Sequence, residues 1–244
     1  MTSTKTEKTH WRKYIDEALG LGIFMFSAGF FDALMEYPGL PVRHWITSDF
    51  LRRFLVGLSM GLTALYIFTS PFGKRSGAYI NPAVTIVRYR LGDIDIKDSL
   101  FYIIFQFLGG TLGLYLVALF FPAWMTHPDV NYIITIPGKA GVPAAFMAEF
   151  LISFILISVV LFMSISKSID RFTPFVVATL ITLFITFEAP FSGMSMNPAR
   201  TFSSAIVAGT WTSFWLYCTA PILGMLAGEW MYIRTRKGRP GFSR

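Results

Sequence analysis

Two Asn-Pro-Ala triplets stand 116 residues apart in this chain of 244 residues. The first consists of Asn81, Pro82 and Ala83, and the second of Asn197, Pro198 and Ala199. Asparagine is a strong N-cap and proline suits the first helical turn, so each triplet predicts the start of a helix. An asparagine fixed at such a cap can also donate its amide N–H groups to a passing solute. The alternative is that both asparagines are structural caps alone.

An arginine follows the second triplet inside otherwise apolar sequence. Arg200 lies three residues after Asn197, and the matching residue of the first copy is Val84. A charge in the hydrocarbon zone of a membrane is costly and by default lines a polar pathway. There the five N–H donors of arginine could bind a solute while its charge repels cations. The alternative is an ion-paired arginine that braces a loop.

Two glutamates also interrupt apolar stretches, at Glu17 and, 132 residues later, at Glu149. A carboxylate within a membrane could relay protons, as it does in pumps. It could instead accept backbone N–H groups that would otherwise have no partner in lipid. Because the two glutamates hold equivalent places before two equivalent triplets, the pattern favours the bracing role.

The elements that must position these residues are membrane helices. Hydrophobic residues make up 54% of the chain and charged residues 14%, against about 25% charged in soluble domains. This composition excludes a soluble enzyme and a nucleic-acid-binding domain, and the single cysteine, Cys218, excludes a disulfide scaffold. A crossing needs about 20 apolar residues. Six stretches qualify, at approximately 16–36, 53–72, 99–122, 145–166, 172–189 and 211–233.

The segments that the two triplets open, 81–90 and 197–209, are too short to cross. Ten helical residues extend about 15 Å, which is half of a bilayer core of about 30 Å. We therefore expect both segments to be re-entrant half-helices.

Six crossings put both termini on the same side of the membrane. With the termini inside, sixteen of the 21 Lys and Arg residues fall in cytoplasmic segments, the bias that orients membrane proteins. The outside receives Arg43, Arg52, Arg53, Lys139 and Arg200. The net charge of +7 is thus explained by topology and indicates no nucleic-acid partner. We expect cytoplasmic termini in a plasma or cell inner membrane.

The chain is predicted to be one membrane domain, 1–244, built from two repeats of approximately 14–122 and 143–235, with polar tails 1–13 and 236–244. Each half has three spans, so the second half must enter the membrane from the opposite face. Inverted repeats of this kind hold their sites at the midplane between the halves. The N-termini of the two half-helices, each carrying about +0.5 elementary charge, would meet there and oppose cations and protons.

The paired boxes SGAYINPAVT and SGMSMNPART, an early glutamate in spans one and four, and glycine-rich third and sixth spans resemble the aquaporin family, also called major intrinsic proteins. The resemblance covers residues from about 14 to 235. It implies an all-α channel of six transmembrane helices and two half-helices, assembled as a homotetramer in the lipid bilayer. It assigns Asn81 and Asn197 to the pore, Arg200 to selectivity, and Glu17 and Glu149 to bracing the loops. No cofactor and no metal site is expected.

Family positions around the arginine map onto Ile185, Met194 and Met60, although without one extra loop residue Gly61 takes the place of Met60. Glycerol facilitators of the family usually carry an aspartate directly after the arginine, where this chain has Thr201. An apolar ring with one arginine offers few hydrogen-bond partners. We expect water as the main permeant together with other small uncharged solutes, the alternative being a facilitator of glycerol or similar neutral solutes.

Two other classes of protein stay open. An inverted-repeat secondary transporter would need an ion site or a titratable relay at the midplane, and no acidic residue stands beside either triplet. A structural membrane protein with a closed pore is the other. No group of residues indicates enzymatic activity.

Overall fold

The computed structural model describes residues 3–236, which are largely helical and contain no strand. The six long helices are α1 (Ser3–Glu36), α3 (Asp49–Thr69), α6 (Ile96–Phe120), α8 (Gly141–Met163), α10 (Thr173–Phe187) and α13 (Phe214–Arg236). Two shorter helices are α5 (Pro82–Leu91) and α12 (Pro198–Ala208). The connecting turns are α2 (Pro41–Trp45), α4 (Pro71–Ser76), α7 (Pro122–Met125), the 3₁₀ turn η1 (Asn131–Ile133), α9 (Lys167–Asp170) and α11 (Ala189–Ser192). The fold is all-α, as predicted.

The predicted tails fall only partly within this range. Helix α1 begins at Ser3, so the predicted polar tail is helical from residue 3 to residue 13 and continuous with the first long helix. Residues 1–2 and 237–244 lie outside the described part of the chain.

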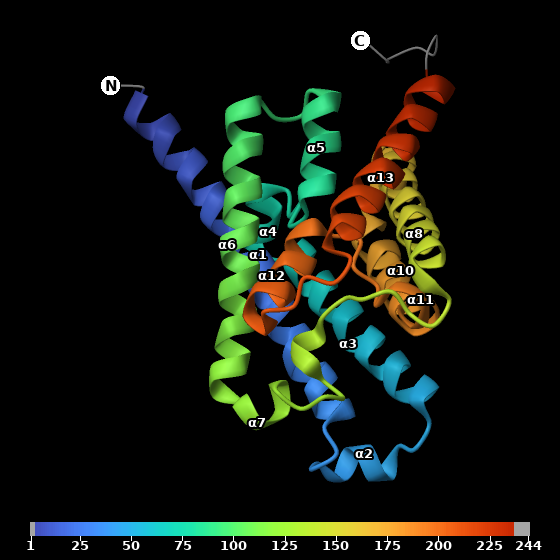
Figure 1. The fold of residues 1–244 in the computed structure, drawn as a ribbon. Helices are drawn as coiled ribbons and strands as arrows, with labels where there is room; N and C mark the ends of the chain where they lie inside the picture. The colour runs from blue at the N-terminus through green and yellow to red at the C-terminus, as the bar shows by residue number, and fades with distance from the viewer. Residues whose placement is uncertain (1–2, 237–244) are drawn as a thin grey trace.

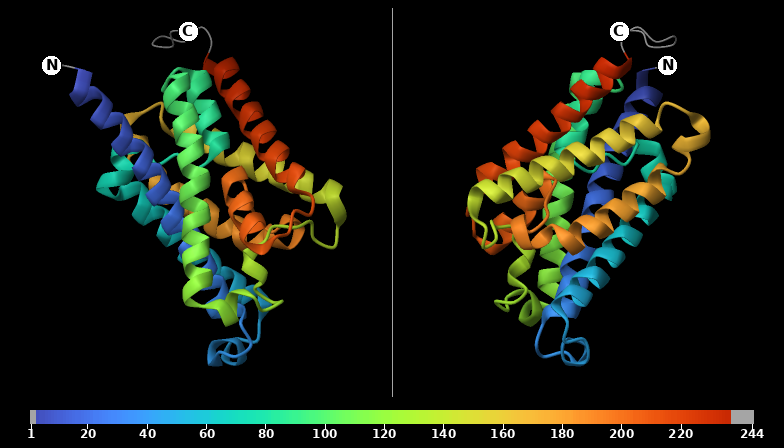
Figure 2. Two further views of the ribbon diagram at one scale, coloured as in Figure 1. Left: turned by 60° about the vertical axis from the view of Figure 1, so that its left-hand side comes forward. Right: turned by 90° about the vertical axis from the view of Figure 1, so that its right-hand side faces the viewer.

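Four helices are long and apolar enough to cross a membrane, namely α3, α6, α8 and the part of α1 from His10 to Glu36. Helix α10 is also apolar but has 15 residues. Helix α13 has 23 residues, among them Glu229, Arg234 and Arg236. The sequence predicted six crossings. Helices α10 and α13 are not among the four that are long and apolar enough to cross. Each packs along one of those four, α10 along α3 and α13 along α8 (Figure 2).

Glycines allow these close helix pairs. A Cβ at Gly57 of α3 would lie 2.7 Å from the backbone oxygen of Thr182 on α10, and a Cβ at Gly22 of α1 would lie 3.0 Å from the backbone oxygen of Gly109 on α6. Because any side chain would push these backbones apart, small residues fix the spacing between the long helices.

The two halves repeat one order of elements, two long helices, a half-helix and a third long helix. Figure 1 shows both termini at one end of the bundle, with α5 in that half and α12 in the other half. Each half-helix packs against the last long helix of both halves, α6 and α13. An ion pair fastens the end of α5 to α13, since Arg90 Nε donates to the buried Glu229 Oε2 at 2.7 Å.

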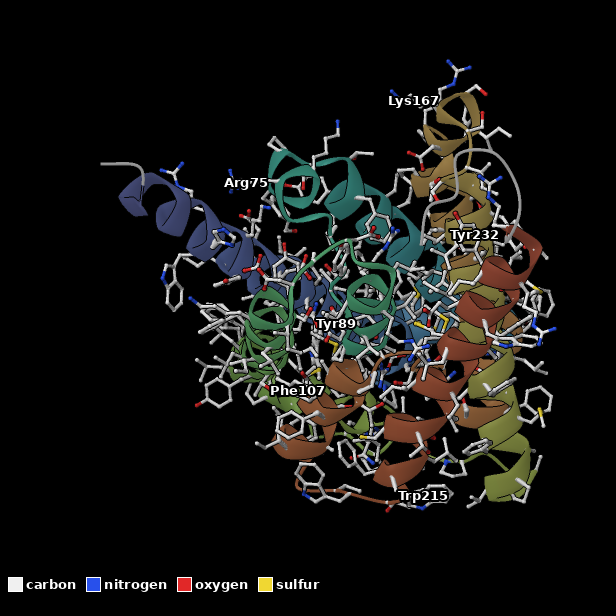
Figure 3. The ribbon with its side chains drawn as sticks, turned by 90° about the horizontal axis from the view of Figure 1, so that it is seen from above. Arg75, Tyr89, Phe107, Lys167, Trp215 and Tyr232 are labelled. Atoms are coloured by element: carbon white, nitrogen blue, oxygen red, sulfur yellow. The ribbon has the colours of Figure 1, made fainter. Side chains whose placement is uncertain are left out.

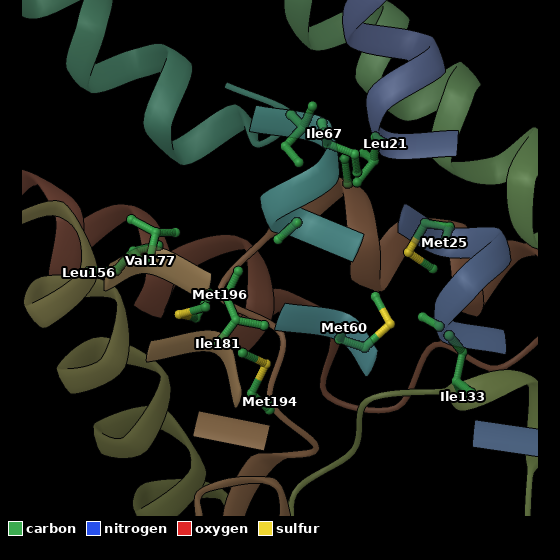
Figure 4. Close-up of a cluster of buried hydrophobic side chains, with 14 of the residues drawn as sticks. Leu21, Met25, Met60, Ile67, Ile133, Leu156, Val177, Ile181, Met194 and Met196 are labelled. Carbon is green, nitrogen blue, oxygen red and sulfur yellow. The ribbon is translucent and has the colours of Figure 1, made fainter. Parts of the chain in front are cut away.

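The core of the bundle is apolar, and so is much of its outside. Figure 4 shows Leu21, Met25, Met60 and Met194 among the buried side chains that gather between the long helices and the chain before α12. Large apolar side chains also cover the outer surface, among them Trp215, which lies at the periphery in Figure 3. Such a surface suits a lipid environment.

Candidate functional site: a cavity lined by both half-helices

Asn81 and Asn197 cap the two half-helices as predicted. Asn81 Oδ1 accepts from Ala83 N at 2.9 Å, and Asn197 Oδ1 accepts from Ala199 N at 3.0 Å. Pro82 and Pro198 occupy the first helical position, and Ala83 and Ala199 are buried directly behind them.

The two caps also bond to each other's loop. Asn81 Nδ2 donates to Met196 O, and Asn197 Nδ2 donates to Ile80 O, both at 2.8 Å. The N-termini of α5 and α12 therefore meet in the middle of the bundle. Each amide has a second N–H, and both asparagines lie on the wall of the same cavity.

The loops that lead into the half-helices are strained in the same way. Ala78 and Ile80 have φ of 46° and 40°, and their counterparts Met194 and Met196 have φ of 50° and 54°. Residues with a Cβ rarely adopt positive φ, and each costs of the order of 1–3 kcal/mol. Some interaction must hold each loop in this shape.

Glu17 supplies that interaction in the first half. It is fully buried and accepts from Tyr79 N at 3.0 Å, from Ile80 N at 2.6 Å and from Gln106 Nε2 at 2.8 Å. Gln106 of α6 was not singled out from the sequence. Its amide also donates to Thr85 Oγ1 of α5, so it ties the glutamate to the half-helix.

Glu149 does the same in the second half. It accepts from Ser195 N, Met196 N and Ser192 Oγ, each at 2.7 Å, and it too is fully buried. Both glutamates thus satisfy backbone N–H groups inside an apolar bundle. This geometry matches the bracing interpretation.

Arg200 is held by the loop between α7 and α8. Its Nη1 donates to Ile133 O at 2.8 Å, and Thr135 Oγ1 lies 2.8 Å from Thr201 Oγ1 on the next residue of α12. Ile133 has a φ of 52°, which turns the carbonyl-bearing segment tightly. Arg200 is half-buried and its side chain lies on the cavity wall.

The cavity has a volume of about 780 Å³ and reaches both ends of the bundle. At the end away from the termini it is lined by Glu36, Asp49 and Arg53. At the other end it is lined by Lys74, Arg88, Asp170 and Thr173. Between them lie both asparagine caps and Arg200, with Val84 on the same wall.

Met60 lines this cavity, and so do Ile185 and Met194. Gly61 points elsewhere, because a Cβ built there would meet Thr182 and, at 2.6 Å, the backbone oxygen of Ala178 on α10. Of the two residues that the sequence left open, Met60 faces the cavity and Gly61 faces the neighbouring helix.

The sequence of the chain matches the model of a known protein family. The family model described as "Major intrinsic protein" matches residues 4–232. The chain belongs to the major intrinsic protein family.

Relatives of the chain within the major intrinsic protein family include plant and animal members. Aquaporin NIP1-1 of Arabidopsis thaliana is 31% identical over 185 residues, covering 74% of this chain and 62% of that protein. Aquaporin NIP3-1 of the same plant is 32% identical over 239 residues, covering 95% of this chain and 70% of that protein. Aquaporin-4 of Mus musculus is 34% identical over 183 residues, covering 71% of this chain and 54% of that protein. Two of these three matches thus span less than two thirds of the relative's length.

Among solved structures, the aquaglyceroporin from Plasmodium falciparum has the same fold. The TM-score is 0.79 and the sequence identity 22%, and the match covers 91% of this chain and 95% of that one.

Asp32 is a cavity residue that sequence reasoning passed over. It lies on α1 and lines the cavity with Arg200, whose guanidinium interacts electrostatically with the Asp32 carboxylate. No ion pair or hydrogen bond joins Asp32 to another of the described residues. The signal was present in the sequence, since Asp32 interrupts an apolar span as Glu17 does.

The charges at the end of the cavity away from the termini pair with one another. Arg52 is buried, donates to Ile46 O at 2.7 Å and to Glu36 Oε1 at 3.0 Å, and also contacts Asp49. Arg43 lies 3.5 Å from Glu36 Oε2. These contacts fix the loop between α1 and α3 at the rim of the cavity. Glu188, at the end of α10, is buried behind the second re-entrant loop.

Proposed function

We propose that this chain is a passive channel for water that also admits other small uncharged solutes and excludes ions and protons. The observation that carries the proposal is one continuous cavity that reaches both ends of the bundle, with Asn81, Asn197 and Arg200 on its wall. The relatives named above are aquaporins, which agrees with this proposal.

Ion exclusion follows from charge at the middle of the cavity. The N-termini of α5 and α12 each carry about +0.5 elementary charge from aligned peptide dipoles, and both open onto the cavity. Arg200 adds a full positive charge on the same wall. Cations meet this barrier directly, and a water that accepts from both asparagine amides cannot pass a proton onward through that pair of hydrogen bonds.

Selectivity among neutral solutes is assigned to Arg200, Met60, Ile185 and Met194. Three of these side chains are apolar, so a solute finds most of its hydrogen-bond partners at the arginine. Such a ring suits water and small uncharged molecules. It gives little discrimination between them beyond size.

A second candidate, a facilitator of glycerol-sized neutral solutes, is favoured by one observation. Asp32 adds a carboxylate acceptor to the cavity that holds the donors of Arg200. A solute with both donors and acceptors could use the two groups together.

A secondary transporter is disfavoured because Glu17 and Glu149 are occupied by backbone N–H groups. The described residues also contain no group of His, Cys, Asp or Glu side chains suited to a metal ion. We further propose that the channel is a homotetramer with both termini in the cytoplasm, in a plasma or cell inner membrane, and that it carries no enzymatic activity.

Stopped-flow light scattering of proteoliposomes tests the proposal. Vesicles with the protein should shrink faster than empty vesicles when an impermeant osmolyte is added, and the rate should be independent of voltage and of a pH gradient. Repeating the shock with glycerol separates the two candidates. Shrinkage no faster than that of empty vesicles in either solute would refute an open channel, and rates that follow a pH gradient would support the transporter.

A further inference from the structure

Behind the second re-entrant loop, the Ser192 hydroxyl lies between the carboxyl groups of Glu149 and Glu188. If both glutamates were ionised, the one hydroxyl proton could not satisfy both contacts. Ser192 Oγ lies 2.7 Å from Glu149 Oε1 and also contacts Glu188 Oε1. The same Oγ accepts from Met194 N at 3.1 Å. A hydroxyl has one proton, so Ser192 can donate to only one of the two carboxyl groups.

Glu149 is the group that accepts. Its two oxygens already receive the backbone N–H groups of Ser195 and Met196 at 2.7 Å, an arrangement that suits a carboxylate. The proton between Ser192 and Glu188 must then come from Glu188. A protonated carboxyl group has both the O–H donor and the carbonyl acceptor that this requires.

The remaining oxygen of Glu188 agrees with this assignment. Glu188 is 8% exposed, and its Oε2 is buried without a hydrogen-bond partner among residues 3–236. An ionised carboxylate left in this way would be far more costly than the carbonyl oxygen of a neutral acid.

The first half of the chain shows what Glu188 adds. Ser76 is the counterpart of Ser192, accepts from Ala78 N at 3.0 Å and interacts with one carboxylate, Glu17. The residue that matches Glu188 is Phe72. The first loop therefore needs a single carboxylate, and the second carboxyl group is an addition in the second half.

Charged and titratable groups surround Glu188 from several helices. Glu149 of α8 is an acidic group that interacts with Glu188, and Arg200 of α12 interacts with Glu149. Tyr217 of α13 donates its hydroxyl proton to Ser192 O at 2.6 Å. Arg53 of α3 donates to Thr186 O at 3.4 Å, two residues before Glu188. Lys139 is exposed in the loop whose Gly138 N donates to Phe191 O at 2.8 Å. None of these cations forms an ion pair with Glu188 within the described residues.

We propose that Glu188 is a positioning residue that holds the second re-entrant loop as a neutral carboxylic acid. Its O–H donates to Ser192 Oγ, and the Ser192 hydroxyl donates to Glu149 Oε1. Met194, which lines the cavity, is fixed by its own bond to Ser192 Oγ. When alkaline solution removes the proton, two carboxylates share one hydroxyl proton and repel each other. Ser192 then loses one of its contacts, and the wall of the cavity at Met194 changes shape.

The variants Glu188→Gln and Glu188→Ala test this inference, which rests on the proposed channel function for its permeation readout. Glutamine keeps a donor and an acceptor but cannot ionise, so it should preserve the water permeability of proteoliposomes at neutral pH. Between about pH 6 and about pH 10, we expect wild-type permeability to fall at least about threefold and that of Glu188→Gln to stay level. Glu188→Ala should be impaired at both pH values.

Infrared difference spectra supply a readout that does not depend on permeation. In a detergent without ester groups, the wild-type protein minus Glu188→Gln should show the C=O stretching band of a protonated carboxylic acid at neutral pH. Absence of that band, or the same pH profile in wild type and Glu188→Gln, would overturn the inference. If even the wild-type protein passes no water, the channel proposal fails while the infrared band still decides the protonation of Glu188.

Discussion

Asn81 and Asn197 each donate to the carbonyl group of the residue that immediately precedes the other. The acceptors are Met196 O and Ile80 O, both at 2.8 Å. These bonds consume one amide N–H of each asparagine and leave the second for the cavity. They also join the two strained loops, so that neither loop can move without the other.

We expect Asn197→Ala to destabilise the protein more than the loss of a helix cap alone. The cap is worth about 0.5–2 kcal/mol. Leaving Ile80 O without its donor adds about 1–3 kcal/mol. The midpoint of thermal unfolding in detergent measures the effect, and the exposed Ser168→Ala provides the control. Equal midpoints for the two variants would contradict the role of the reciprocal bond.

Arg200→Val should neutralise the cavity wall and relax its selectivity. The change copies Val84, the residue that the first half carries at the matching position. Glycerol flux relative to water flux in proteoliposomes should rise, since a bulky cation is replaced by a small apolar side chain. Arg171→Val, at an exposed site next to Phe172, should leave this ratio at the wild-type value. An unchanged ratio in Arg200→Val would count against the proposed role of Arg200 in selectivity.

Neighbouring substitutions on α3 should separate permeation from stability. Met60→Ala enlarges the cavity and should raise the permeability to glycerol-sized solutes. Gly61→Ala drives a methyl group into Ala178 and Thr182 of α10, and we expect a loss of about 1–3 kcal/mol in stability. Glycerol flux should therefore rise in Met60→Ala and stay near the wild-type value in Gly61→Ala, whose effect should appear in the thermal unfolding midpoint. The reverse pattern would mean that Gly61 faces the cavity.

Asp32→Leu tests the acceptor on α1. If a solute is held between Asp32 and Arg200, removing the carboxylate should lower the ratio of glycerol to water permeability. Asp32→Asn keeps a carbonyl acceptor of the same size and should retain most of the wild-type ratio. Identical ratios in the leucine variant and the wild type would exclude a role for Asp32 in solute selection.

Much of the architecture could be predicted from local sequence. The caps at Asn81 and Asn197 were predicted because an Asn-Pro pair determines a helix start within two residues. The fifth span was expected at 172–189 and the helix runs from Thr173 to Phe187. Hydropathy located the first apolar span at about 16–36 but not the start of its helix, because α1 already begins in polar sequence at Ser3.

What the sequence left open depends on contacts between distant segments. Met60 and Gly61 are adjacent, and only the position of α10 determines which of them faces the cavity. The partner of Arg200 is a backbone carbonyl, Ile133 O, which carries no side-chain signal. The contact between Glu188 and Ser192 was not predicted, because the turn of α11 is what brings the two side chains together.

The reciprocal bond between the asparagine caps also bears on how the chain is made. The first half leaves the ribosome with the Asn81 amide and the Ile80 carbonyl lacking their partners, because both belong to residues more than a hundred positions downstream. The midplane can therefore close only after the second half has been synthesised and inserted. The contact between the two half-helices is therefore a late step of biogenesis, and a truncated first half would leave the Asn81 amide and the Ile80 carbonyl without these partners.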